Sequence, residues 1–419
     1  MVAELPLWAV RLRAERRNRL WSQKEMARRL VEAADEETRR GLPVRETIVR
    51  RIKAYEAGHN QPRDPYRLLY VRAFGVSEED LFGEHVASSK GKETREGLPD
   101  ESGALADERL NYAIKHPGSV DLVAVARIRE RVHALGARYD NVSAASLLVD
   151  AGQHFGQVAF LRTQASSSLV QRELCTVEAE AATLMGQLVW DASQRRDHAT
   201  TRAYLAQAVA AARQIHDLAA EGHALLRTSF VALYTEKDPQ AALDLALQAA
   251  QRAGHSSLVL RGLGLLHAAE AYATLGRRQP DCEHALGEAE TCFEQISTVD
   301  AAIDMFSPAQ HGRLAGSCYL LLNDAKRAES ILESTAQALH GRPKSKAIVL
   351  GNLALARVRQ GKLDMAAASL NSAIDVVART RGGGGFNIVF SVGRELRPWR
   401  EAPVIRDVYD RLFALVAAA

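Results

Sequence analysis

Residues 47–58 read TIVRRIKAYEAG, and this stretch decides how the first part of the chain folds. Its apolar side chains Ile48, Ile52 and Tyr55 recur at the spacing that lines one face of a helix. The remaining side chains are basic or small: Arg50, Lys53 and Ala54 fall on the opposite face, with Val49 and Arg51 on the flanks. Such a helix either exposes a solvated basic face or enters a groove while its apolar face packs on a core. This stretch alone leaves both interpretations open.

Two helices are predicted before this stretch. Residues 7–17 have helical periodicity. Ser22 is followed three residues later by Glu25, a capping box in which each side chain satisfies a free backbone N–H. The second helix opens there and buries its own apolar stripe, made of Met26, Ala27 and Leu30. The charge run, Gly41 and Pro43 of residues 35–44 predict a loop.

The third helix is expected to begin at Thr47 as its N-cap and to end at Gly58 in a left-handed conformation. Pro62 and Pro65 mark the exit. A fourth helix is predicted over residues 66–74 and a short fifth one over 78–82.

The segments SQKEMARRL, RETIVRRIKAYEAG and QPRDPYRLLYVRAFGVSEEDLFG together resemble the Xre/Cro family of helix-turn-helix repressors in its actinobacterial form. In that family the third helix ends in an aromatic-Glu-x-Gly signature, here Tyr55, Glu56 and Gly58. The resemblance implies that the third helix enters the major groove of DNA. It also implies an ion pair between Arg16 of the first helix and Glu56.

The resemblance gives a set of expected DNA contacts. Arg50 is expected to read a base edge, since an arginine fork matches the acceptors of guanine. Lys53 is expected to reach a base or a phosphate. Backbone contacts are expected from Ser22 and Gln23 at a helix N-terminus and from Arg51 and Arg63. The complete set of expected DNA-binding residues is Ser22, Gln23, Val49, Arg50, Arg51, Lys53, Ala54, Asn60 and Arg63.

One departure from the family concerns the connection between the second and third helices. The family's turn is about four residues long, whereas residues 32–46 are available here. Either the second helix runs on by a turn or two, or an insert lies between the pair. The long connection leaves open the angle at which the third helix is presented.

The composition favours a helical protein with a local basic patch. Of the 419 residues, 47% are hydrophobic and only 6% aromatic, so the core is built from Ala and Leu, which favour helices. The first 84 residues hold 17 Lys and Arg against 14 Asp and Glu, and the remainder holds 37 of each. All the excess positive charge therefore lies in the first fifth of the chain, where it could meet phosphate.

The sequence predicts a cytoplasmic protein. No apolar run approaches the roughly 20 residues that span a bilayer, and the N-terminus mixes charges into its apolar residues instead of forming a signal-peptide core. The four cysteines contain no CxxC pair and are too scattered for a disulfide framework, so they are expected to be buried thiols.

Residues 84–107 are polar and predict a flexible linker. Beyond them, helix pairs are predicted to start near residues 171, 220, 258, 307 and 345, at spacings of 49, 38, 49 and 38. Turns are expected near Gly276, Asn323 and Gly361. An earlier pair is expected over 120–136 and 143–163, and residues 382–385, GGGG, predict a flexible break before capping helices over 386–397 and 404–416.

These pairs resemble tetratricopeptide repeats. Small residues occupy comparable places in their second helices, namely Ala241, Ala285, Ala328 and Ala367. The resemblance is partial, because the pairs exceed the repeat's length of about 34 residues and lack its Trp. In tetratricopeptide regulators an asparagine in the first helix of a pair can clamp a peptide backbone, and Asn352 is the matching candidate. A groove-facing polar residue without a ligand is the alternative.

No catalytic chemistry is predicted. The thirteen histidines form no HxxxH, HExxH or Cys/His cluster, and the GGGG stretch lacks the lysine of a phosphate-binding loop. The expectation is therefore a non-enzyme with no cofactor and no metal.

The sequence thus predicts an all-α protein: a five-helix helix-turn-helix domain over residues 1–83, a linker over 84–107 and a tetratricopeptide-like array over 108–419. The expected function is a sequence-specific transcription regulator that binds double-stranded operator DNA. Its array is expected to sense a peptide or small-molecule effector, to mediate homodimerisation, or both. The alternative is an interaction scaffold whose N-terminal domain binds no DNA.

Overall fold

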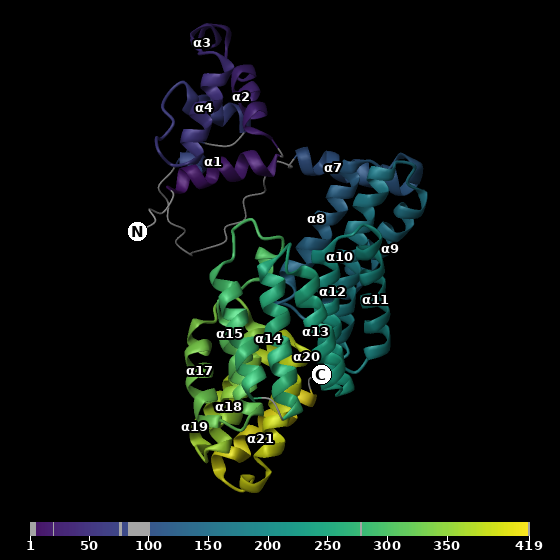
Figure 1. Cartoon of the computed structure of the whole chain (residues 1–419), viewed down its shortest axis with the longest axis vertical. Helices are drawn as coiled ribbons and strands as arrows, with labels where there is room; N and C mark the ends of the chain where they lie inside the picture. Colours follow the sequence, from purple (N-terminus) through teal and green to yellow (C-terminus); the bar gives the residue numbers. More distant parts are fainter. Residues whose placement is uncertain (1–5, 20, 75–77, 83–100, 277–278, 418–419) are drawn as a thin grey trace. The chain divides into compact units, whose positions relative to one another are not determined.

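The computed structural model describes residues 6–19, 21–74, 78–82, 101–276 and 279–417, and every regular element within these ranges is helical. The predicted all-α class is confirmed for this part of the chain. The chain separates into two compact units, Met1–Gly97 and Leu98–Ala419, which are described separately here (Figure 1). Within the same ranges, no helix combines the length and the apolar character needed to cross a membrane.

The N-terminal unit is a bundle of short helices around one apolar core. Its helices are α1 (Leu7–Asn18), α2 (Gln23–Glu32), α3 (Glu36–Gly41), α4 (Arg45–Glu56), α5 (Tyr66–Phe74) and α6 (Glu78–Phe82). The predicted stripes are buried, and Met26, Leu30, Ile48 and Ile52 are all fully inaccessible. Through them α2 packs against α4 and α5, while α1 packs against α4 and α6.

The connection between α2 and α4 contains a helix where a loop was predicted. Asp35 caps α3 by accepting a hydrogen bond from the Thr38 N–H at 2.9 Å. Arg39 donates from Nη2 to the carbonyl oxygen of Ala34 at 3.2 Å and from Nε to that of Val31 at 3.3 Å. The long connection is therefore an insert, held on the carboxyl end of α2. The prediction of a loop missed it because the charge run also supplies the cap and the tether.

The predicted helix caps are partly wrong. α4 begins at Arg45, two residues before the predicted cap, and Thr47 lies in its first turn with its N–H bonded to the Val44 carbonyl. Ser22 caps α2 as expected, but the Glu25 carboxylate binds Arg28 and Arg29 instead of completing the capping box. Gly58 ends α4 with a φ of +75°, as predicted.

The second unit is an array of helical hairpins (Figure 1). Its helices are α7 (Glu101–Lys115), α8 (Leu122–Arg138), α9 (Leu148–Gln164), α10 (Ser168–Ala192), α11 (His198–Gln214), α12 (Leu218–Val231), α13 (Pro239–Ala253), α14 (Leu258–Leu275), α15 (Gln279–Glu294), α16 (Ala309–Leu321), α17 (Ala325–Ala338), α18 (Pro343–Arg359), α19 (Leu363–Thr380), α20 (Gly383–Glu395) and α21 (Pro403–Ala417). The five predicted hairpin starts fall within three residues of the starts of α10, α12, α14, α16 and α18.

The hairpins stack in two layers. Each of α10, α12, α14, α16 and α18 packs against the next helix of this set as well as against its own hairpin partner. The predicted turns all have positive φ, which is +70° at Gly276, +62° at Asn323 and +74° at Gly361. Of the predicted small residues in the second helices, Ala285, Ala328 and Ala367 are buried, whereas Ala241 is only partly buried and its neighbour Ala242 packs inside.

The predicted linker ends earlier than expected. Residues 84–100 lie outside the described residues, but residues 101–107 belong to α7. Asp107 of that helix accepts hydrogen bonds from Arg127 at 2.6 and 2.9 Å and from Arg131 at 2.8 Å. These ion pairs to α8, together with buried Leu110 and Ala113, stabilise a segment whose polar composition suggested no structure.

The GGGG stretch, predicted as a flexible break, forms the tightly packed start of α20. The Gly383 N–H donates to Asp191 Oδ1 at 2.6 Å, and Lys344 Nζ binds Asp191 Oδ2 at 2.9 Å. A Cβ atom at Gly383 would lie 3.0 Å from the Asp191 carbonyl oxygen, so a larger residue would have to push the end of α10 away. The end of α10 thus joins α18 and α20, which lie more than 150 residues further along the chain.

Candidate nucleic-acid interface

A buried carboxylate fixes the last turn of α4. Glu56 is 3% exposed, and its Oε2 accepts hydrogen bonds from Arg16 Nη2 at 2.8 Å and from Gln23 Nε2 at 3.0 Å. Arg16 Nη1 also donates to the Trp21 carbonyl oxygen at 2.7 Å. The expected pair of Arg16 and Glu56 is therefore present, and its hydrogen bond raises the pKa of Arg16. Gln23 has a structural role that the sequence did not predict.

The first turn of α4 is tied to the same part of α2. Arg45 Nη2 donates to the carbonyl oxygen of Lys24 at 3.1 Å. Both ends of α4 are therefore bonded to the first turn of α2, through Glu56 at one end and Arg45 at the other. This second tie was missed from the sequence, because a hydrogen bond to a backbone carbonyl leaves no residue pattern. It fixes how α4 lies on α2 despite the long connection.

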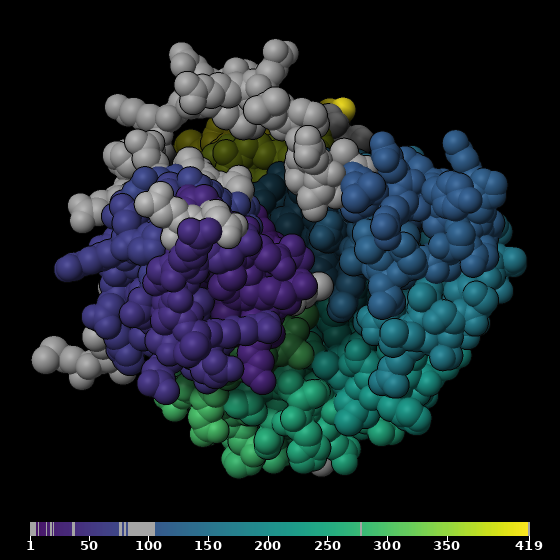
Figure 2. Space-filling model, turned by 90° about the horizontal axis from the view of Figure 1, so that it is seen from above, coloured from purple at the N-terminus to yellow at the C-terminus, as the bar shows by residue number. Residues whose placement is uncertain are grey.

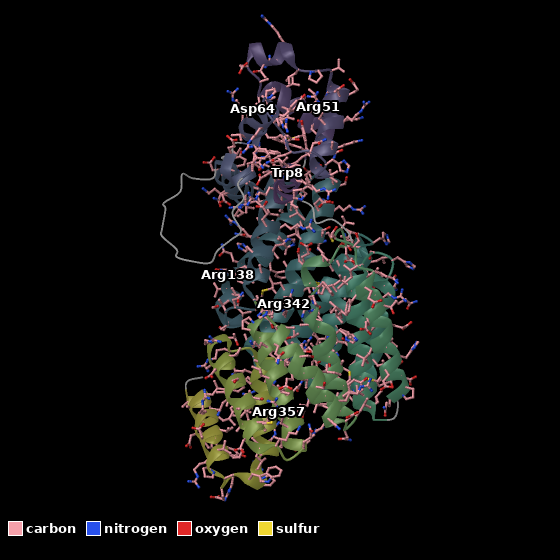
Figure 3. All side chains as sticks on the ribbon, turned by 90° about the vertical axis from the view of Figure 1, so that its left-hand side faces the viewer. Trp8, Arg51, Asp64, Arg138, Arg342 and Arg357 are labelled. Carbon is pink, nitrogen blue, oxygen red and sulfur yellow. The ribbon has the colours of Figure 1, made fainter. Side chains whose placement is uncertain are left out.

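The face of α4 away from the core is basic and open to solvent. Arg50 and Lys53 are exposed, and Ala54 between them is partly exposed. Val49 packs partly against the core. Arg51, which Figure 3 labels, places its guanidinium 5.1 Å from the ring centre of Tyr66 and is held beside the exposed face.

The other expected contacts lie around this helix. Ser22 is exposed at the start of α2, where its Oγ accepts from the Glu25 N–H at 3.1 Å. Asn60 and Arg63 are exposed in the segment after α4. We define the basic face as the exposed residues Arg50, Lys53, Asn60 and Arg63 together with Arg51.

Ion pairing separates the cations of α4 from six arginines elsewhere in the unit. These six arginines have carboxylate partners: Arg16 with Glu56, Arg19 with Glu15, Arg28 and Arg29 with Glu25, Arg67 with Glu78, and Arg72 with Asp35. Among the described residues, no carboxylate forms a salt bridge with Arg50, Lys53 or Arg63. The positive charge of the basic face is therefore not neutralised within the unit.

The remaining candidates from the sequence are metal ligands, the cysteines and Asn352. In the ranges that the structure describes, no group of three His, Cys, Asp or Glu side chains could hold a metal ion. The four cysteines are buried and free, as predicted. Asn352 lies in α18, is 7% exposed and belongs to the packed interior of the array.

Comparisons do not assign the chain to a family. No known family matches the sequence, and no curated protein is significantly similar to it.

Proposed function

We propose that the chain is a sequence-specific DNA-binding transcription regulator in which α2 and α4 act as a helix-turn-helix pair and α4 reads the major groove. One observation carries this proposal: the unpaired basic face of α4 lies on a helix whose two ends are both bonded to α2. Unpaired cations on a rigid helix can displace counterions from phosphates. A fixed helix also brings an arginine fork to base edges in one register.

The second unit is proposed to be a tetratricopeptide-like array that senses a ligand and supports dimerisation. Stacked hairpins build an extended surface suited to binding, and operators with two-fold symmetry are commonly bound by dimers. The alternative is a scaffold in which the first unit binds no DNA. The presence of α3 favours that alternative, because it is an extra helix at the carboxyl end of α2, between the two helices of the expected pair.

Two substitutions on α4 separate reading of bases from attraction to phosphates. A DNA sequence selected by the full-length chain from random duplexes would serve as the probe, with a scrambled duplex beside it. Arg50→Ala is expected to weaken binding to the selected duplex by about 1 to 3 kcal/mol and to relax selectivity at one position. Lys53→Ala is expected to weaken binding to both duplexes alike. It should also reduce the slope of log affinity against log salt concentration by about one.

Fluorescence anisotropy at several salt concentrations measures both effects. Arg13→Ala, which removes an exposed arginine of α1, is the matched control. It should change the affinity for either duplex by no more than the loss of one positive charge away from α4 explains. Equal losses on the selected and scrambled duplexes for Arg50→Ala would contradict base reading. Failure of the wild-type chain to enrich any sequence would favour the scaffold.

A further inference from the structure

Three arginines of the second unit lie in or just after helices of one layer, the layer that contains α10, α12 and α16. Arg195 follows α10, Arg227 lies in α12 and Arg313 lies in α16. In Figure 2 the blue, teal and green parts of this unit follow one another in an arc. All three arginine residues keep partial solvent access. We call these three residues the inner arginines.

Shared neighbours show that the inner arginines converge. The charges of Arg195 and Arg227 both act on the Tyr139 hydroxyl, and those of Arg195 and Arg313 both act on the Tyr234 hydroxyl. Arg227 and Arg313 also act on each other. Geometry links the same groups. The ring centre of Phe230, beside Arg227, lies 6.4 Å from that of Trp190 and 6.3 Å from that of Tyr234, the two rings beside Arg195. Arg313 lies one turn before Ser317, whose Oγ donates to Glu270, the carboxylate that also accepts from the Tyr234 hydroxyl.

In the part of the chain that the structure describes, no salt bridge joins an inner arginine to a carboxylate. Among the described residues, neither Arg195 Nε nor Arg313 Nε has a hydrogen-bond partner, and Arg227 Nε donates only to the neutral acceptor His223 Nε2 at 3.2 Å. The nearby carboxylate Glu270 is bonded to Ser317 Oγ at 2.8 Å and to the Tyr234 hydroxyl. Arginines that lose hydration without gaining a counter-charge are costly to keep.

Two other arginines of this unit, Arg357 and Arg129, are paired with carboxylates. Arg357 bonds Glu329 at 3.0 Å and Glu333 at 2.7 Å, and Arg129 bonds Glu180 at 2.9 Å. The inner arginines therefore differ from the structural arginines of the same array. Desolvation lowers the pKa of Arg195 and of Arg227, although the charges of Asp191 and Glu270 on Arg195, and of Asp140 on Arg227, act in the opposite direction.

Aromatic rings hold two of these side chains in place. The Arg195 guanidinium carbon lies 4.3 Å from the ring centre of Trp190 and 4.9 Å from that of Tyr234. The Arg227 guanidinium carbon lies 5.5 Å from the ring centre of Phe230. Arg195 also has a φ of +66°, an uncommon backbone conformation for a residue with a side chain. Arg195 and Arg227 are thus fixed in advance, which favours tight binding of an anion.

We propose that the inner arginines form a binding site for a compact polyanion that carries two or more carboxylate or phosphate groups. Guanidinium groups bind both kinds of oxyanion through paired N–H donors, and three of them match more than one charged group. This site deepens the proposed function by naming the class of effector. Binding of the anion does not depend on the proposed function, whereas the role of the anion as a regulator rests on it.

Direct binding to the full-length chain in the absence of DNA tests the site. Isothermal titration calorimetry with pyrophosphate and with citrate separates the phosphate source from the carboxylate source. We expect saturable binding of at least one probe, and at least a tenfold loss of affinity in Arg227→Gln and in Arg313→Gln. Arg394→Gln, which removes an exposed arginine of α20, should leave the affinity unchanged. The proposal would be overturned if neither probe bound, or if Arg227→Gln and Arg313→Gln retained the affinity of the wild-type chain and of the control.

Thermal unfolding without anion distinguishes a binding role from a structural one. Because the inner arginines are unpaired, Arg313→Gln should melt no lower than the wild-type chain and should lose the rise in melting temperature that the bound probe produces. A lower melting temperature without anion, together with an unchanged rise on adding the probe, would assign these arginines to folding alone. Neither result depends on whether the first unit binds DNA.

Discussion

Glu56 is the residue on which the placement of α4 depends. It is buried, and its charge is compensated by Arg16 and by the amide of Gln23. The ion pair could be expected from the family resemblance, since both residues match its pattern. The hydrogen bonds of Gln23 and Arg45 could not, because they depend on how two separate helices cross.

Removal of Arg16 tests this role. Arg16→Ala should lower the free energy of unfolding of the N-terminal unit by about 3 kcal/mol, because it leaves a buried carboxylate without its cation. Hydrogen exchange of the full-length chain, followed by mass spectrometry on peptides from α1 and α4, measures the change locally. Glu15→Ala, which breaks the more exposed pair with Arg19, should cost only about 0.5 kcal/mol. Equal exchange in the two variants would contradict the role of Glu56.

His223 predicts a pH dependence of stability in the second unit. Burial, followed by the charge of Arg227, lowers the pKa of His223 to about 3, whereas an unfolded histidine has a pKa of about 6.5. The unfolded chain therefore binds a proton below pH 6.5 that the folded chain does not bind. The contribution to stability is complete above that pH and falls as the pH drops toward 3.

Denaturant unfolding at pH 7 and pH 5 measures this effect. Between pH 7 and pH 5, proton uptake by His223 in the unfolded chain should lower the free energy of unfolding of the wild-type chain by up to about 2 kcal/mol. The His223→Gln chain should lose correspondingly less. His255→Gln, which removes an exposed histidine, should behave as wild type. An identical loss in the wild-type and His223→Gln chains would show that His223 is not held neutral.

At the scale of elements, the helices that carry a strong apolar period could be predicted and those that depend on distant contacts could not. The hairpins from α10 to α19 were found because each buries a stripe of small and aliphatic residues. α3 and the first turn of α7 were missed, since their charged residues suggested loops. Ion pairs and backbone contacts stabilise both elements instead of an apolar face.

One repeating signal in the sequence was overlooked. A residue with positive φ is followed by an aspartate that caps the next helix at His216 and Asp217, at Lys237 and Asp238, and at Asn323 and Asp324. Aspartate is a strong N-cap, and an αL residue before it reverses the chain. The aspartate at each of these three places therefore marks the residue directly before a helix.

The contact between α10, α18 and α20 gives a prediction at the same scale. Lys344→Met should lower the free energy of unfolding of the second unit by about 3 kcal/mol, because Asp191 is buried and would lose its cation. Lys344 and Asp191 are 6% and 5% exposed at their side chains. Lys326→Met, an exposed lysine of α17, is the control. Urea unfolding curves that coincide for the two variants would contradict this account of the contact between Asp191 and Lys344.

At the scale of the whole molecule, the two units divide the proposed function. The first presents an unpaired basic face on a fixed helix, and the second holds unpaired arginines within a stacked array. The candidate residues of the first unit could be chosen from the sequence, because one helix period places them together. The inner arginines could not, since Arg195, Arg227 and Arg313 come from three separate helical hairpins with no shared motif.

The central claim is that α4 reads DNA. Genomic footprinting of the tagged full-length chain in its source cell tests it most directly, with the Arg50→Ala, Lys53→Ala double variant and the Arg13→Ala control examined in parallel. The wild-type and control chains should protect discrete sites, with half-sites about 10 base pairs apart if a dimer binds, and the double variant should lose them. Discrete sites that the double variant retains, or no discrete sites for the wild-type chain, would contradict the claim.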